Sequence, residues 1–447
     1  MNNVKPCDVL IIGGGAAGLA AALTAARRGL KVCLLEKNDR CGKKLSQTGN
    51  GRCNYTNKAI APSAYNSDSM ETVETVLSAF GWQQTVAFFE GIGIVPSFRE
   101  GYCYPASGEA RSFSDMLTAA VSDAGAEIIA SCTMTGIEET GGGFLVSAER
   151  TIESNGKKGP SGKKAASKVS EAAEKAKNLV SEKGMTYCTK SLVLASGGAA
   201  APKTGSAGEG YRFLEGLGLP LVKPLPALTS LHLGKPYDPA LFGIRAQGSV
   251  LVRSEGKVLS EDRGEIQFAK EGLSGIPVMN VSGRAVRALD AGKPVELILN
   301  MFPEGMSAEI LFSIVKKSGR ERTVSLALTG LLSYKSVPFF LAQAGLKRDM
   351  TVGAFQMQDA EKLCKVLTGL TFPVTGFADF NRAQVTSGGL LLASISPTTM
   401  EVKGHPGLYV IGEMLNCDGS CGGYNLQWAF ATGYLSGQAV CGKGKLC

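Results

Sequence analysis

Apolar residues near the start of the chain predict two buried strands around one helix. Residues 7–12 and 31–36 are mostly apolar, as in strands of a parallel sheet that are covered on both faces. Residues 16–29 are rich in Ala and Leu, which favour a helix. Three consecutive glycines separate the first strand from the helix. Strand, glycine turn, helix and strand together make a βαβ unit.

The pattern beyond this unit predicts further elements, broken by one polar segment. We expect a helical region at about 70–91 and strands at 126–136, 143–150 and 186–195. The segment 151–185 has no aromatic residue and few large apolar ones. It is therefore predicted to be a hairpin insertion, partly disordered, with a solvated helix in its second half.

The middle of the chain has a different pattern. Short β-like runs alternate with turns between 250 and 300, and the Leu-rich stretch 307–347 has helical periodicity. We expect one inserted substrate domain over 205–370, β-barrel-like, with a helical sub-lobe at about 303–350.

The α/β pattern returns from residue 371, with a strand predicted at 408–413 and a helix at 424–438. The predicted fold class is therefore α/β. A Rossmann-type nucleotide-binding domain is formed by 1–204 and 371–447, and the inserted domain interrupts it.

A glycine motif in the first turn indicates the ligand of this domain. Gly13-x-Gly15-x-x-Gly18 follows a strand and opens a helix. Its glycines suit a tight turn, the approach of backbone to a pyrophosphate, and close helix–strand packing. Glu36 ends the second strand, where an acid bonds a ribose hydroxyl. A glycine turn without a ligand is the alternative. The predicted FAD contacts in this unit are Gly13, Gly15, Ala16, Ala17, Gly18, Glu36 and Lys37.

A second glycine-rich loop follows the acidic residue. We expect it beside the pyrophosphate and the isoalloxazine ring, where cations offset phosphate or reduced-flavin charge. A flexible surface loop with solvated lysines is the alternative. The expected contacts are Lys43, Lys44, Gly49, Asn50, Gly51, Arg52, Cys53 and Asn54.

Two further glycine motifs complete the predicted site. One ends the strand at 186–195 and lets the chain cross close to the cofactor. The other follows the strand at 408–413, and N–H groups at the start of the 424–438 helix are expected to face the pyrimidine edge of the flavin. An ordinary glycine-capped helix is the alternative there. The remaining expected contacts are Met134, Ala195, Ser196, Gly197, Gly198, Gly412, Glu413, Asp418, Gly422, Gly423, Tyr424, Asn425 and Leu426.

In this order, the four motifs resemble those of bacterial flavoproteins of the aminoacetone oxidase family and of 3-dehydro-bile acid Δ4,6-reductase-like proteins. The resemblance covers nearly the whole chain. Its most specific parts are GRCNYTN at 51–57 and GGYNLQWA at 422–429. It implies an FAD domain split by an inserted β-barrel and helical region.

The sequence departs from that family in three places. A Thr-His pair often found there is missing from 268–275, so no role of that histidine is carried over. The usual Asp-Gly-Pro-Thr-Gly-Gly is Asp-Gly-Ser-Cys-Gly-Gly at 418–423, which puts the Cys421 thiol near the expected flavin. The insertion 151–185 is also longer than usual.

The charge and its distribution along the chain limit the kinds of binding partner that we expect. The formal charge is +8, and half of this excess lies in 151–185, so a uniformly basic nucleic-acid surface is not indicated. Docking of an acidic partner on that segment is an alternative.

No apolar stretch approaches the roughly 20 residues of a membrane span. Scattered cysteines without a secretory signal indicate a cytoplasmic protein. His232 and His405 are the only histidines, so no metal site and no Ser-His-Asp hydrolase is expected.

A flavin reductase needs one proton donor beside its substrate. We predict Tyr104, Tyr424 and Arg52 as catalytic residues, with Tyr102 and Cys103 as further candidate donors. Arg111 is a candidate for binding an anionic substrate.

The expected activity is NAD(P)H-dependent reduction of a conjugated C=C bond in a small molecule, steroid-like as in one branch of the resembled family. No second clean G-x-G-x-x-G occurs, so NAD(P)H is expected as a diffusible donor rather than in a domain of its own. An oxidase of a small amine or aminoketone is the first alternative. A flavin-containing RNA-binding protein is a more remote one.

Overall fold

The computed structural model describes residues 4–153 and 179–441, and the chain forms two units. Met1–Pro224 and Gly388–Cys447 make up the first unit, and Leu225–Ser387 makes up the second. Each unit has its own buried apolar core.

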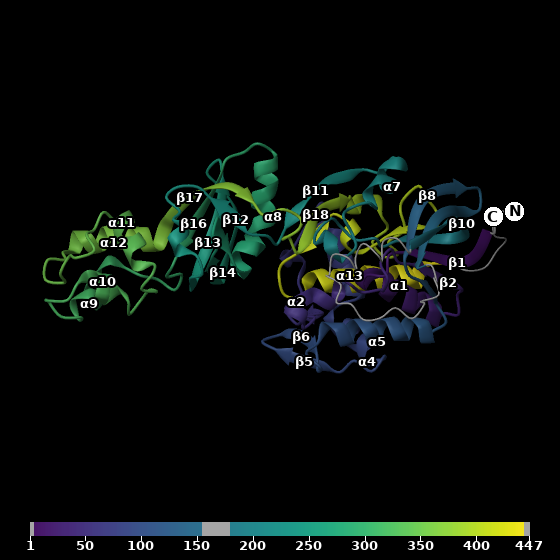
Figure 1. Cartoon of the computed structure of the whole chain (residues 1–447), viewed down its shortest axis with the longest axis horizontal. Helices are drawn as coiled ribbons and strands as arrows, with labels where there is room; N and C mark the ends of the chain where they lie inside the picture. The colour runs from purple at the N-terminus through teal and green to yellow at the C-terminus, as the bar shows by residue number, and fades with distance from the viewer. Residues whose placement is uncertain (1–3, 154–178, 442–447) are drawn as a thin grey trace, which may run out of the picture. The chain divides into compact units, whose positions relative to one another are not determined.

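The first unit is built on one sheet, drawn with its helices in Figure 1. β1 (Val4–Ile12) pairs in parallel with β2 (Val32–Leu35) on one side and with β10 (Leu179–Leu194) on the other. Every residue of β2 and the last four of β1 are buried, as in strands covered on both faces. β7 (Glu127–Ile129) pairs with β2, and β19 (Leu408–Val410) pairs with β10. The C-terminal segment thus completes the sheet that the N-terminus begins.

An antiparallel extension lies beside β10. β9 (Gly143–Glu153) pairs with β10, and β8 (Cys132–Thr140) pairs with β9. Because β9 and β10 remain paired out to Glu153 and Leu179, both arms of the predicted hairpin are present. The rest of the predicted insertion, 154–178, lies outside the described residues.

One predicted strand is broken, and one predicted helical region consists of two helices. The strand expected at 126–136 is divided between β7 and β8, because Ser131 has a left-handed φ of 55° that a strand cannot continue through. The helical region expected at about 70–91 consists of two helices, α3 (Met70–Ala79) and α4 (Trp82–Glu90), separated at Phe80 and Gly81.

The first and last helices of this unit pack against each other. A Cβ on Gly433 of α13 (Tyr424–Ala439) would lie 2.4 Å from the carbonyl oxygen of Ala17 in α1 (Ala16–Arg27). One turn later, Gly437 meets Ala21 in the same way, at 2.7 Å. Glycine on one helix and alanine on the other therefore allow the backbones to approach closely. The remaining α-helices described in this unit are α2 (Thr48–Gly51), α5 (Ala110–Asp123) and α7 (Tyr211–Gly216).

Small sheets connect segments that are far apart in sequence. They pair β3 (Thr56–Asn57) and β5 (Pro96–Arg99) with β6 (Tyr102–Pro105), β4 (Tyr65–Ser67) with β20 (Cys417–Gly419), and β11 (Leu221–Ala227) with β18 (Val385–Leu390).

The second unit is a closed barrel with a helical part, which confirms the β-barrel-like insertion. Apolar residues alternate with more exposed ones along the strands, so the barrel interior is filled by side chains. In order around the barrel, the strands are β12 (Leu231–Leu233), β15 (Gly272–Ser274), β14 (Lys257–Phe268), β13 (Arg245–Ser254), β16 (Val295–Asn300) and β17 (Leu370–Phe377). The helices are α8 (Ile276–Asp290), α9 (Ala308–Lys316), α10 (Val324–Leu328), α11 (Val337–Gln343) and α12 (Met357–Gly369).

The unit boundaries lie after the predicted ones at 204/205 and 370/371. α7 buries Tyr211 and Leu214 in the core of the first unit, so this segment cannot belong to the insertion. β17 closes the barrel, so the second unit continues past residue 370. Within the described residues, no helix is long and apolar enough to cross a membrane.

Candidate cofactor and active site

Two glycines of the first motif shape the turn itself. A Cβ on Gly18 would lie only 1.9 Å from the carbonyl oxygen of Gly13. Gly13 has a φ of 107°, and its Cβ would lie 2.4 Å from the carbonyl oxygen of Ala195. These positions hold α1 against β1 and β10, and the backbone leaves no space for a side chain at either of them.

Gly15 differs from Gly13 and Gly18 because the position of its Cβ is open. It is the N-cap of α1, with φ −82° and ψ −171°, and a Cβ there would meet no atom within 4 Å. No side chain caps the helix, and its first turn has no acidic residue. The N–H groups and the positive end of α1 are thus available to an anion that approaches the backbone at Gly15. A pyrophosphate fits this open helix end.

The carboxylate of Glu36 is fixed beside this turn. It is 7% exposed. It accepts hydrogen bonds from the backbone N–H of Gly14 and from both nitrogens of Asn38, each at 2.7 Å. A carboxylate has about four lone-pair positions, so one remains for a ribose hydroxyl. Lys37 is turned outward and forms an exposed ion pair with Glu209.

The second glycine-rich loop lies against the first turn. The N–H of Gly42 donates to the carbonyl of Gly14 over 2.8 Å. Lys44 forms an ion pair of 2.6 Å with Glu413, which joins the second motif to the fourth. Lys43 pairs with Asp39 at 2.8 Å and thereby lowers the pKa of that carboxyl. The lysines are therefore anchored by acids of the loops.

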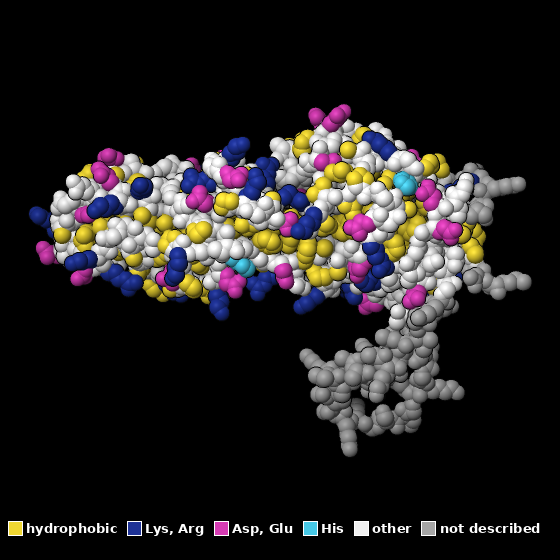
Figure 2. Space-filling view, turned by 90° about the horizontal axis from the view of Figure 1, so that it is seen from above, with side chains coloured by type: hydrophobic (Ala, Val, Ile, Leu, Met, Phe, Trp, Pro, Cys, Tyr) yellow, Lys and Arg dark blue, Asp and Glu magenta, His cyan; other side chains and the backbone are white. Residues whose placement is uncertain are grey.

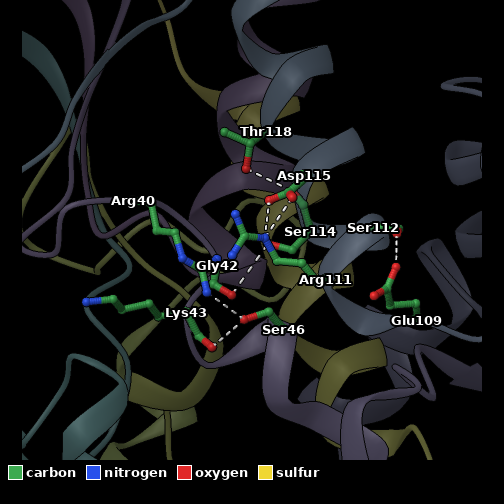
Figure 3. Close-up of polar contacts among 10 residues, drawn as sticks. All are labelled: Arg40, Gly42, Lys43, Ser46, Glu109, Arg111, Ser112, Ser114, Asp115 and Thr118. Atoms are coloured by element: carbon green, nitrogen blue, oxygen red, sulfur yellow. Dashed lines mark hydrogen bonds and ion pairs between the residues drawn. The ribbon is translucent and has the colours of Figure 1, made fainter.

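Figure 3 shows the outer side of this loop facing α5. The guanidinium of Arg111 is turned back onto the carboxylate of Asp115, with N–O distances of 2.7 and 2.9 Å. This exposed ion pair engages Nε of the guanidinium that is expected to bind an anionic substrate. Arg40 donates to Ser46 at 3.2 Å, while its Nη1 is buried without a partner among the described residues.

The run from Thr48 to Asn54 is a tight, left-handed loop. Gly49, Asn50 and Cys53 have φ values of 57°, 53° and 58°. The Cys53 side chain is fully buried, and burial raises its thiol pKa to about 12, so it packs inside the protein. Arg52 is exposed, and no hydrogen bond or ion pair holds its guanidinium within the described part of the chain.

The third motif adjoins the first turn. The N–H of Ala195 donates to Ile12, and Ser196 contacts the sulfur of Met414 at 3.2 Å. Gly197 has a φ of 80°, and the carbonyl of Gly198 accepts a hydrogen bond from Ser206. Elsewhere in the sheet, Met134 is buried in the core of the unit.

The fourth motif meets the second at the start of α13. Gly423, the N-cap, has φ 92° and ψ −7°. A Cβ there would lie 2.8 Å from the carbonyl oxygen of Thr56 and 2.9 Å from Oδ1 of Asn54. That Oδ1 is buried without a partner among the described residues. The loop therefore presents an unsatisfied acceptor of the kind that an imide N–H of a bound ring satisfies.

Hydrogen bonds hold the loop before α13 in place. Asn425 both accepts from and donates to the backbone of Gly419, at 2.9 and 2.7 Å. Asp418 is buried and accepts from Asn66 at 3.0 Å. Leu426 packs against the apolar core, and Gly412 lies under Ala17 of α1.

Comparison with known proteins places the chain in a family. The model of the HI0933-like protein Rossmann domain matches residues 7–158 and 161–439. The chain belongs to this family. It is 31% identical over 434 residues to the 3-dehydro-bile acid delta(4,6)-reductase of Clostridium scindens, covering 96% of this chain and 98% of that protein. It is 26% identical over 438 residues to the ribosomal RNA dihydrouridine synthase of Escherichia coli, covering 96% and 97%.

The solved structure of 3-ketosteroid delta1-dehydrogenase from Sterolibacterium denitrificans is 13% identical, with a TM-score of 0.48 and coverage of 98% of this chain and 99% of that one. Family membership confirms the resemblance drawn from the four motifs. The HI0933-like chain is an FAD-dependent oxidoreductase. The open end of α1, the fixed Glu36 and the unsatisfied Asn54 fit that cofactor.

The tyrosines predicted as catalytic residues or proton donors differ in where they lie relative to the fourth motif. Tyr102 and Tyr104 lie on the same face of β6, and Cys103 points to the opposite, buried face, where burial raises its pKa. A Cβ on Gly422 would lie 2.6 Å from the ring of Tyr102. The structure thus brings Tyr102 to the fourth motif, directly beside the start of the Tyr424 helix.

Two residues of this region were not predicted from the sequence. Tyr65 is 3% exposed and donates its hydroxyl to the carbonyl of Tyr424 at 2.9 Å. Gln427 is fully buried, accepts from Thr56 and Thr85, and donates to Phe80. Gln427 was detectable as a polar residue within an apolar helix, whereas Tyr65 lies in a polar stretch without a signal.

Proposed function

We propose that this HI0933-like chain reduces a C=C bond conjugated to a carbonyl group in a small, steroid-like molecule. FAD is the bound cofactor and NAD(P)H the diffusible electron donor. The first motif and Glu36 hold the pyrophosphate and ribose, and the loops of Asn54 and Gly423 hold the ring. FAD, when bound, supplies the hydride for the substrate.

The chemistry implied by two relatives supports this reaction. The Clostridium scindens protein is named as a reductase of a 3-dehydro bile acid, and the Escherichia coli protein as a synthase of dihydrouridine. Dihydrouridine is uridine whose ring double bond, conjugated to a carbonyl, has been saturated. Both names describe the addition of a hydride and a proton to a conjugated double bond.

The observation that carries the proposal is the pair of phenols at the start of α13, where the rings of Tyr102 and Tyr424 meet at Gly422. Both phenols can donate a proton, and both side chains are only half-buried, so part of each is open to a substrate. The histidines are engaged elsewhere: His405 with Glu139 at 2.9 Å, and His232 with Glu271 at 3.3 Å. This chemistry suits reduction better than nucleophilic catalysis.

A steroid-like substrate is favoured because the identity to the bile-acid reductase, 31%, exceeds that to the RNA enzyme, 26%. Uridine in ribosomal RNA is the second candidate, since the formal charge is +8. On the face shown in Figure 2, however, Lys and Arg are interspersed with Asp and Glu. A cytoplasmic location, where NAD(P)H is present, is part of the proposal.

Anaerobic stopped-flow tests the electron donor first. The yellow protein is mixed with NADH and, separately, with NADPH, and bleaching of the flavin band is followed. Rapid bleaching with either nucleotide is expected. If neither bleaches the flavin but a small amine or aminoketone does, the oxidase alternative replaces the proposal.

The reduced protein is then mixed with one of two probes. A 3-dehydro bile acid with conjugated double bonds is expected to restore the flavin band with loss of the dienone absorption. Ribosomal RNA lacking dihydrouridine is the second probe, and its product is measured by mass spectrometry. Formation of dihydrouridine without reaction of the bile acid would transfer the assignment to RNA.

A further inference from the structure

Two tyrosine rings come together at one glycine at the start of α13. A Cβ on Gly422 would stand 2.6 Å from Cε1 of Tyr102 and 3.4 Å from Cε2 of Tyr424. These ring atoms adjoin the carbon that carries the hydroxyl, so the phenol ends of both side chains lie near one point of the loop. Both residues are half-buried, which leaves part of each accessible to a ligand.

The backbone at this point is held independently of the two phenols. The hydroxyl of Tyr65 donates to the carbonyl of Tyr424 at 2.9 Å, and the two rings pack edge to face with centroids 6.0 Å apart. Asn57 donates to the carbonyl of Gly422 at 3.1 Å. The start of the helix is therefore fixed by Tyr65 and Asn57, and removal of a phenol oxygen from Tyr424 leaves these bonds intact.

We propose that Tyr424 is the proton donor of the reductive reaction and that Tyr102 is the residue that positions its phenol. This inference rests on the proposed function, because it names the group that supplies the proton of that reaction.

The step balances in atoms and electrons. The β-carbon of the conjugated bond accepts a hydride from the reduced cofactor, and the electron pair of the C=C bond moves to the α-carbon. The O–H bond of Tyr424 breaks as a C–H bond forms at that carbon, and the phenolate regains its proton from water. Burial, and then the neighbouring Tyr102, raise the pKa of the Tyr424 hydroxyl. It is therefore protonated at neutral pH and acts as an acid.

The other candidate donors fit this role less well. The guanidinium of Arg52 does not release a proton in proteins. Cys103 is fully buried on the far face of β6. Tyr104 is two residues farther along the strand than Tyr102, opposite Ser97. Tyr102 and Tyr424 are the pair whose rings meet at Gly422.

Three substitutions of Tyr by Phe distinguish the proton donor from the residue that positions it and from a control. Tyr424→Phe is expected to slow reoxidation of the reduced flavin by the bile-acid probe about 10²–10⁴-fold, the usual contribution of a general acid. Reduction by NAD(P)H should change by less than about twofold. Tyr434→Phe is the matched control on the same helix, where the ring stacks on Phe80 at 4.4 Å, and both rates should be unchanged.

Tyr102→Phe has a signature of its own. We expect a smaller loss, about tenfold, and an alkaline limb of the pH–rate profile that moves to lower pH, because Tyr102 no longer raises the pKa of Tyr424. Tyr65, whose ring packs edge to face against that of Tyr424, stays in place in this variant. A large loss in Tyr104→Phe with normal Tyr424→Phe kinetics would overturn the proposal.

A second measurement needs no turnover. A tyrosine against the isoalloxazine ring quenches flavin fluorescence by electron donation, and phenylalanine does not. Measured in a Tyr102→Phe background, where the neighbouring phenol no longer quenches, the fluorescence of bound FAD should rise about severalfold in Tyr424→Phe and stay constant in Tyr434→Phe. Constant fluorescence in both variants would mean that Tyr424 does not lie against the flavin, and this result would overturn the inference. Raised fluorescence in a protein that reduces neither probe would instead support the position of Tyr424 and reject the proposed function.

Discussion

Gly15→Val is expected to abolish FAD retention while the protein still folds. A Cβ at Gly15 meets no protein atom within 4 Å, and its φ of −82° suits any residue. The added methyl groups would therefore stand only in the space of the ligand. Gly18→Ala is the opposite case, because its Cβ would lie 1.9 Å from the carbonyl oxygen of Gly13.

The expected changes in folding free energy and in FAD affinity distinguish Gly15→Val from Gly18→Ala. Loss of glycine at the N-cap costs on the order of 1 kcal/mol of folding free energy. Displacing a pyrophosphate from two backbone N–H groups removes two charge-assisted hydrogen bonds, about 3–6 kcal/mol together. The FAD dissociation constant of Gly15→Val should thus rise roughly 10²–10⁴-fold. Gly18→Ala should lose at least about 1–3 kcal/mol of folding free energy through overpacking, with or without FAD.

The assay compares apoproteins. Flavin is removed, thermal unfolding is followed by circular dichroism, and FAD binding is titrated by calorimetry. The melting temperature of apo Gly15→Val should fall by no more than about 4 °C. If Gly15→Val purifies with stoichiometric flavin, the open end of α1 is not the pyrophosphate site. If its apoprotein unfolds as early as that of Gly18→Ala, the space at Gly15 is needed for folding.

Two further predictions concern the ribose and the ring. Glu36→Gln should weaken FAD binding by about 1–3 kcal/mol, since the charge that accepts the ribose bond is lost; an unchanged dissociation constant in calorimetry would contradict this. Gly423→Ala should lower the flavin midpoint potential by about 30 mV, roughly 1.4 kcal/mol for two electrons, measured by photoreduction against a reference dye. Gly404→Ala is its control, because Gly404 has a similar φ of 86° with no atom near its Cβ; equal shifts in both variants would reject a local effect on the flavin.

The βαβ unit could be predicted because its signals are local. β2 is apolar on both faces, the glycines follow a strand directly, and the predicted helix at 424–438 agrees with α13 within one residue. Each of these features depends on residues that are neighbours in sequence, so composition and periodicity suffice to find them.

The unpredicted features depend on contacts between distant segments. The strand break at Ser131 uses a left-handed serine, a conformation that its sequence does not mark. The bond from Tyr65 to Tyr424 exists because β4 pairs with β20. The choice of Tyr102 over Tyr104 at Gly422 follows from the register of β6, and a pattern of period two assigns both to one face without saying which one meets the helix.

The glycines of the first and fourth motifs carry different weight as evidence for a cofactor. At Gly15 protein atoms leave the Cβ position empty, so the requirement for glycine must come from a ligand. At Gly423 the backbone of Thr56 and Oδ1 of Asn54 already exclude a Cβ, and the left-handed φ adds a second reason. Glycine there fixes the start of α13 whether or not a flavin is bound. The contact of this loop with the ring therefore has to be tested by properties of the flavin itself, its potential and its fluorescence, and not by the glycine pair alone.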